Sequence, residues 1–164
     1  MRRKEREVRD SGSIESIIAR CDVCRIALTD GSTPYIVTLN FGYVPGQPGR
    51  LWFHCAKECR KIDMIRKNAF VCFQMDTDHE LIQGEQACDC TMHYSSIVGY
   101  GNIEIIEENE RKTEGLNAIL SHYSSRKEFF YNPQTLARTT ILCLTITELT
   151  AKKLSGKLNV PSNV

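Results

Sequence analysis

Six segments of this chain have the residue pattern of β-strands, and most of them follow one another through turns. Each segment alternates apolar with polar positions or is rich in β-branched and aromatic residues. They cover residues 24–30, 35–43, 51–54, 70–77, 96–106 and 139–149. The regular strand–helix alternation of a Rossmann fold is absent, so five or six such strands predict a mainly β or α+β domain. We expect an antiparallel barrel or sandwich with peripheral helices.

Helical spacing of apolar residues occurs in only a few places. It appears at residues 13–21, at 56–67 and again around 116–123. The stretch 79–96 has no clear period, so we expect a long excursion there, which in a compact domain is often functional. At 164 residues the chain fits a single domain, and we expect about 1–10 and 152–164 to be loosely ordered.

The charge balance argues against two classes of partner. Lys and Arg total 21 against 20 Asp and Glu, so no strong positive field would hold nucleic acid. No apolar run approaches the roughly 20 residues that span a bilayer. The charged first residues, MRRKEREVRD, lead into no apolar segment of the secretory type. We therefore expect a cytoplasmic protein that binds neither nucleic acid nor membrane.

The eight cysteines suggest free thiols or a metal site rather than a disulfide framework, since the expected compartment is reducing. Cys21 and Cys24 have a spacing common in zinc sites, and together with Cys88 and Cys90 they could form a four-cysteine site. The alternative is that Cys21 and Cys24 are buried as small hydrophobic residues. We favour burial and predict no metal.

The stretch LWFHCAKECRKIDMIRKN, residues 51–68, contains a second candidate for a metal site. If 55–66 is helical, Cys55, Cys59 and Ile62 share one stripe that faces the core. Zinc ligands must converge on one point at about 2 Å, which disfavours His54, Cys55 and Cys59 as a ligand set.

On the same helical wheel Lys57, Arg60 and Lys61 form a separate basic stripe. A solvated helix face is the simpler interpretation of such a stripe. Its position just after a strand favours another one, because backbone N–H groups, the helix dipole and three cations could meet a single phosphate there. The sequence thus indicates a phosphorylated ligand.

Four segments in the same order resemble the pyridoxamine 5′-phosphate oxidase-like flavoproteins. FHCAKECRKIDMIRKN (53–68) resembles their phosphate-binding strand-to-helix turn, and RIALTDGSTPYIVTLNFGY (25–43) looks like their first hairpin. FHCAKECRK, CFQMDTDHE (72–80) and YSSIVGYGNIE (94–104) look most like the nitroimidazole-resistance branch. The resemblance covers about residues 5–150.

The resemblance implies a split β-barrel that forms a homodimer with flavin mononucleotide (FMN) between the subunits; FAD is the alternative cofactor. The phosphate ligands of the family map onto Arg60 and Lys61, with Lys57 as an addition. Contacts to the flavin ring carry over to the strand residues Val37, Thr38, Leu39 and Asn40, to Ser96 from a neighbouring strand, and to His54.

The function implied is a flavin-dependent oxidoreductase that reduces a small acceptor such as a nitroimidazole or another nitroaromatic compound. His54 is the candidate catalytic residue, although it could equally be a structural histidine. A flavin- or haem-binding module without turnover is the alternative. Pyridoxamine phosphate oxidation is disfavoured, since the C-terminal LSGKLNVPSNV lacks the expected Arg-rich end. Two residues depart from the family pattern: Cys59 replaces Ser or Gly, and Cys90 replaces an aromatic residue.

Overall fold

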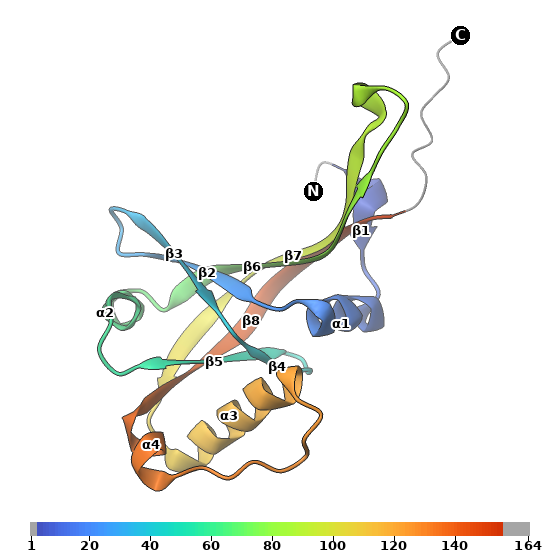
Figure 1. Cartoon of the computed structure of the whole chain (residues 1–164). Coiled ribbons are helices and arrows are strands. Elements are labelled where there is room, and N and C mark those ends of the chain that lie inside the picture. The colour runs from blue at the N-terminus through green and yellow to red at the C-terminus, as the bar shows by residue number, and fades with distance from the viewer. Residues whose placement is uncertain (1–2, 156–164) are drawn as a thin grey trace.

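The computed structural model describes residues 3–155, and a strongly curved antiparallel sheet lies at its centre (Figure 1). The elements in chain order are η1 (Lys4–Arg6), β1 (Glu7–Val8), α1 (Ser11–Arg20), β2 (Cys24–Thr29), β3 (Pro34–Leu39), β4 (Gly42–Val44), β5 (Arg50–Ala56), α2 (Arg60–Lys67), β6 (Phe70–Ile82), η2 (Ala87–Asp89), β7 (Thr91–Ile106), α3 (Asn109–Tyr123), α4 (Pro133–Arg138) and β8 (Thr139–Leu154).

The strands hydrogen-bond in the order β3-β2-β6-β7-β8-β5-β4, and β1 adds to β8. The sheet is therefore not closed, and β3 and β4 are its two ends. Every pairing is antiparallel, from the short β4–β5 hairpin to the long β7–β8 ladder. This arrangement confirms the predicted mainly β architecture with peripheral helices.

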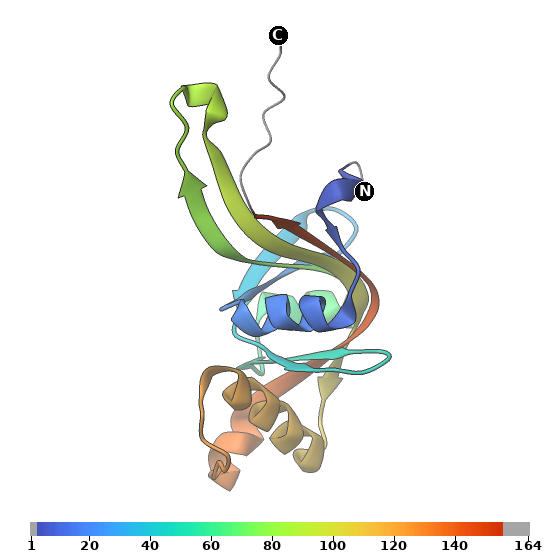
Figure 2. The ribbon, with the colours of Figure 1, turned by 90° about the vertical axis from the view of Figure 1, so that its right-hand side faces the viewer.

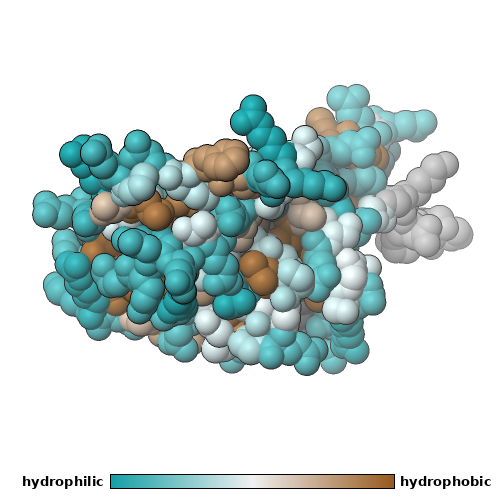
Figure 3. All heavy atoms as spheres, turned by 90° about the horizontal axis from the view of Figure 1, so that it is seen from below, coloured by the Kyte–Doolittle hydropathy of each residue, from teal (hydrophilic) through white to brown (hydrophobic). Residues whose placement is uncertain are grey.

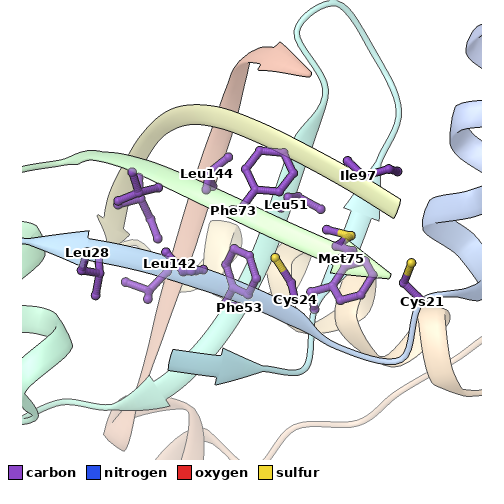
Figure 4. Close-up of a cluster of buried hydrophobic side chains, with 14 of the residues drawn as sticks. Cys21, Cys24, Leu28, Leu51, Phe53, Phe73, Met75, Ile97, Leu142 and Leu144 are labelled. Atoms are coloured by element: carbon purple, nitrogen blue, oxygen red, sulfur yellow. The ribbon is translucent and has the colours of Figure 1, made fainter. Parts of the chain in front are cut away.

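One hydrophobic core fills the concave side of the sheet. The inward-facing positions alternate along each strand, and the side chains labelled in Figure 4 come from five strands and from Cys21, the C-cap residue of α1. Figure 2 shows α1 lying across one side of the sheet, where Ile17 and Ile18 are buried in this core. Asp10 caps the start of α1 by accepting a hydrogen bond from the Ser13 N–H at 2.8 Å.

A smaller core lies on the outer face of the sheet, beneath α3. Trp52 of β5 and Cys143 of β8 point outward there and pack against Ile119 of the helix. The backbones come very close at one point, because a Cβ on Gly42 would lie 2.2 Å from the Ala118 carbonyl carbon. Seen from below in Figure 3, the end formed by α3 and α4 is mostly hydrophilic, with hydrophobic residues in small separate groups.

The helix predicted at 56–67 is shorter than expected and begins at Arg60. The ladder between β5 and β8 continues to the pair Ala56–Thr139, so the backbone groups of Ala56 are used by the sheet. The chain then bends, and Cys59 is still extended at φ −168° and ψ 155°. The helical wheel therefore does not apply to Cys55 or Lys57, which corrects the two stripes predicted from it.

The expected excursion at 79–96 is instead the end of a long β-hairpin. β6 continues to Ile82 through a bulge between Thr77 and Glu80, and β7 begins at Thr91. This β6–β7 arm extends away from the body of the molecule (Figure 1). Its periodicity is hidden because both faces meet solvent, as the exposed Leu81 and Met92 show.

Three smaller differences concern the ends of elements. The predicted strand 35–43 divides into β3 and β4, and the helix α4, which starts with Pro133 after an Asn132 cap, was not predicted. The two ends of the chain, expected to be loosely ordered, are ordered where β1 pairs with the end of β8. There Glu7 lies opposite Lys152 and Val8 lies opposite Ala151. Residues 156–164 lie outside the described chain. In the described part, no helix combines the length and apolar character needed to cross a membrane.

We predict that Gly42→Ala destabilises the protein, because the added methyl group would collide with the backbone of α3. Overpacking of this kind typically costs about 1–3 kcal/mol. Gly12→Ala in α1 is the matched control, since its new Cβ would meet only Asp10 at an ordinary 3.5 Å. Thermal unfolding followed by circular dichroism measures both variants. Equal melting temperatures for Gly42→Ala and the parent would contradict the close approach.

Candidate functional site

The start of α2 carries two cations that have no carboxylate partner among residues 3–155. The Arg60 guanidinium lies over the ring of Tyr35, with its carbon 4.5 Å from the ring centre. Lys61 donates to the sulfur of Cys59 at 3.3 Å. Neither cation is neutralised by these contacts, so the helix start keeps its positive charge.

Lys57, predicted to join them, lies elsewhere. It belongs to the bend after β5 and lines a cavity together with Arg66 and Lys112. The predicted trio is therefore divided: Arg60 and Lys61 stay at the helix start, and Lys57 faces a different set of neighbours. The reason is the bend at 57–59, which replaces the helical turn that would have aligned all three side chains.

The same corner holds a pair of unlike thiols. Burial raises the pKa of Cys55 to about 11. Partial burial also acts to raise the pKa of Cys59, but the Ile62 N–H, the Lys61 ammonium and the Cys55 thiol outweigh it and hold the pKa of Cys59 below its usual value. Cys59 is thus the more nucleophilic of the two thiols at neutral pH. It occupies the N-cap position of α2, where the family resemblance predicts Ser or Gly.

β3 lies at the open edge of the sheet, beside this corner. Within residues 3–155 it pairs with β2 alone, so one side of its backbone has no ladder partner there. Val37 and Leu39 pack against the core, whereas Thr38 and Asn40 are exposed. Of the four predicted ring contacts on this strand, the side chains of Thr38 and Asn40 are accessible to a ligand, and the other two offer only their backbone.

His54 lies on the outer face of β5, two residues beyond the buried Trp52. It pairs with Ile141 in the ladder, and its ring is exposed with no hydrogen bond to another described residue. A structural histidine is normally held by such bonds. His54 is therefore free to contact a ligand bound outside the sheet.

Ser96 is far from the other predicted contacts. It lies on the outer face of β7 opposite Asp76, and β2 and β6 separate its strand from β3. The arm residues 88–94 are farther still from His54. His54 pairs with Ile141 and Tyr94 pairs with Leu154 on the same strand, which corresponds to about 40 Å along β8 at roughly 3.3 Å per residue.

The outer face of β3, β2, β6 and β7 is unusually apolar for an exposed surface. Its exposed members are Ile36, Phe70, Val98 and Tyr100, and Phe70 stacks on Tyr100 with ring centres 6.0 Å apart. A shallow cavity of about 220 Å³ lies among them, lined by Arg25, Ala27, Ile36, Cys72, Phe73 and Gln74. We call this surface the apolar face. One feature of the sequence could have indicated the apolar face, because Ile36 is apolar at an outward-facing position of the hairpin.

A polar network crosses the apolar face at one edge. The Arg25 guanidinium donates to Asp76 at 2.6 Å and to Gln74 at 3.2 Å. His79 lies 2.9 Å from the other carboxylate oxygen of Asp76. These groups satisfy one another, so they fix the orientation of their side chains rather than attract a further ion.

The remaining cysteines are widely separated. Cys21 and Cys24 are buried in the main core, as the favoured interpretation predicted, and burial raises the pKa of Cys21 to about 11. Cys88 and Cys90 are exposed at the tip of the β6–β7 arm. Across residues 3–155, no three His, Cys, Asp or Glu side chains gather closely enough to hold a metal ion. The four-cysteine alternative is therefore wrong for this arrangement.

Comparison with known proteins agrees with the geometry. The family model for pyridoxamine 5′-phosphate oxidase matches residues 10–153. A candidate 5-nitroimidazole antibiotic resistance protein from Bacteroides thetaiotaomicron is 31% identical, with a TM-score of 0.79, over 90% of this chain and 86% of that one. No curated protein sequence matches significantly.

Two further solved structures share the fold at low identity. The flavocytochrome Anf3 from Azotobacter vinelandii is 15% identical with a TM-score of 0.80, over 96% of this chain and 73% of its own. The FAD and haem binding protein from Mycobacterium smegmatis is 15% identical with a TM-score of 0.81, over 93% and 75%. Together with the matched family model, these similarities confirm the split-barrel architecture, and the chain belongs to the pyridoxamine 5′-phosphate oxidase family.

Proposed function

We propose that this protein binds FMN and acts as a flavin-dependent oxidoreductase that reduces a small planar acceptor, such as a nitroimidazole. The observation that carries the proposal is the uncompensated cation pair at the start of α2, beside the open edge of β3. The nitroimidazole-resistance relative, at 31% identity over most of both chains, supports the choice of acceptor.

The corner fits the phosphate of a flavin in charge and in donors. Arg60 offers a planar fork of N–H groups and Lys61 offers an ammonium, and both lie at the positive end of the α2 dipole. The stacking of Arg60 on Tyr35 holds its guanidinium near β3. A phosphate would add the negative charge that no carboxylate of the described chain supplies there.

The ring of the flavin would then lie along β3. Thr38 and Asn40 expose polar side chains there, and an amide such as that of Asn40 can both donate to and accept from ring heteroatoms. A bound flavin would supply the electron-transfer chemistry. The protein's part is to position it, and His54 offers an exposed imidazole whose ring nitrogens can donate or accept a hydrogen bond.

The site needs a second copy of the chain. Ser96 and residues 88–94 are too far from His54 to join it within one molecule, but a copy packed against the apolar face could bring them in. Exposed apolar patches of this kind often mark protein interfaces. We therefore propose a homodimer in which each subunit completes the flavin site of the other.

We expect purified protein to show a flavin spectrum, or to acquire one when FMN or FAD is added. Arg60→Ala combined with Lys61→Ala should weaken flavin binding by several kcal/mol, at about 1.5–3 kcal/mol for each charge-assisted hydrogen bond. Lys67→Ala, which removes one exposed cation at the other end of α2, is the control. Fluorescence titration measures the affinities. A protein that takes up neither flavin would refute the proposal, and an unchanged affinity of the double variant would show that the cations are only solvated.

For turnover, we expect the flavin-loaded protein to consume NADH or NADPH in the presence of a nitroimidazole. His54→Gln should lower kcat by about 100-fold if the imidazole transfers a proton, a larger effect than the loss of its ring contact has on flavin affinity. His79→Gln on the β6–β7 arm is the control. Flavin binding without any catalysed reduction would favour the alternative function of a flavin-binding module.

For the assembly, we expect light scattering to give twice the chain mass of 18.7 kDa. Val98→Lys places a charge in the centre of the apolar face and should yield a single-chain mass with reduced flavin content. Phe130→Lys changes a residue that is 94% exposed but lies off this face, so it should stay dimeric. A parent protein with the mass of one chain would contradict the dimer.

A further inference from the structure

A separate cavity of about 180 Å³ lies where β5 and β7 end and β8 begins. We call it the basic cavity. Five distinct parts of the chain contribute to it: the bend after β5, α2, the end of β7, α3 and β8. Its polar lining consists of Lys57, Arg66, Lys112, Thr140 and Glu107, and Ile62 forms part of an apolar wall.

Two of the polar residues are almost completely buried. Lys112 is 5% exposed and Thr140 is 7% exposed. In the described chain, neither the Lys112 ammonium nor the Thr140 hydroxyl makes a hydrogen bond or an ion pair with another residue. Neither polar atom is fully buried. Among the described residues, Trp52 Nε1 is the fully buried side-chain nitrogen or oxygen that lacks a hydrogen-bond partner, so the Lys112 nitrogen and the Thr140 oxygen keep some accessible surface. Their polar ends therefore open into the basic cavity.

The charges around the basic cavity do not balance. Three cations face one carboxylate, that of Glu107, and no ion pair forms between them. Arg66 has one other neighbour, Asp63 at 3.8 Å, but both side chains are more than half exposed and the pair contributes little. A lysine with so little exposure is rare unless a negative charge accompanies it. An anion with several acceptor oxygens would balance these charges.

We propose that the basic cavity binds a phosphoryl group. Its volume is below the roughly 300–1,000 Å³ of pockets that enclose a whole small molecule, so it fits one anionic group. The excess of about two positive charges matches phosphate, which carries about −1.5 to −2 at neutral pH, better than a singly charged carboxylate. Lys112, Arg66 and Lys57 donate to its oxygens, and Thr140 adds a hydroxyl. The phosphoryl group comes either from free phosphate or from a larger ligand whose remainder stays outside.

The proposal does not depend on flavin binding, and calorimetry with inorganic phosphate and with pyrophosphate tests it on the full chain at constant ionic strength. We expect saturable binding of at least one of them by the parent protein. Lys112→Met keeps the buried aliphatic stem and should lower the affinity at least tenfold. Lys67→Met, which removes an exposed cation of α2 outside the basic cavity, should not change it. Circular dichroism confirms that the variants fold.

Two results would overturn the proposal: no saturable phosphate binding by the parent, or equal affinity in Lys112→Met. If Lys112→Met proves unstable, Arg66→Gln replaces it, because the Arg66 side chain is more than half exposed and is not part of the core. Acetate at the same concentration should bind at least tenfold more weakly, and equal binding would also count against a phosphoryl site. Titrations of Lys112→Met with FMN and with FAD identify the source of the phosphoryl group. If the variant loses affinity for FAD alone, the basic cavity binds the second phosphate of a dinucleotide. If it loses affinity for neither flavin, the cavity binds a separate phosphorylated ligand.

Discussion

The pairing of β8 with three other strands is the constraint on which the rest of the structure depends. β8 forms ladders with β7 along most of its length, with β5 at its beginning and with β1 at its end. Its first residues decide where β5 must stop, because the last pair of that ladder is Ala56 with Thr139. The bend at 57–59 and the start of α2 follow from that end point, so the position of the candidate site is set by strand pairing and not by the helix itself.

Close contact of backbones makes this long ladder possible. Gly99 and Gly101 lie on the concave side of β7, where a Cβ on Gly101 would be 2.2 Å from the Thr145 oxygen and one on Gly99 would be 2.4 Å from the Phe73 ring. The register of β7 against β8 shifts between these two glycines. Small residues and an irregular register allow a sheet to bend sharply, and here the bend curves the open sheet around its core.

Strand positions could be predicted because burial on one face imposes a period of two, which Cys24, Ile26 and Leu28 follow without exception. The start of α2 could not be predicted, because the local sequence favours a helix from Ala56, whereas the backbone of Ala56 pairs with Thr139 of the distant strand β8. The β6–β7 arm was missed for the opposite reason: with solvent on both faces, no period is imposed on residues such as Leu81. The resemblance placed Arg60 and Lys61 correctly at a helix start. The large distance between Ser96 and His54 could not be predicted, because it depends on the order in which the strands pair, which local sequence patterns do not encode.

The bend after β5 also explains why cations that adjoin in sequence serve different surroundings. If the segment were helical, one stripe would contain Lys57, Arg60 and Lys61, and the three cations would act on the same ligand. In the structure the chain instead bends at 57–59, and the helix begins only at Arg60, so Lys57 is not aligned with Arg60 and Lys61. Lys57 is thereby directed to the basic cavity, while Lys61 remains beside Cys59 and lowers its pKa. The bend at 57–59 thus divides three cations that are close in sequence between the start of α2 and the basic cavity.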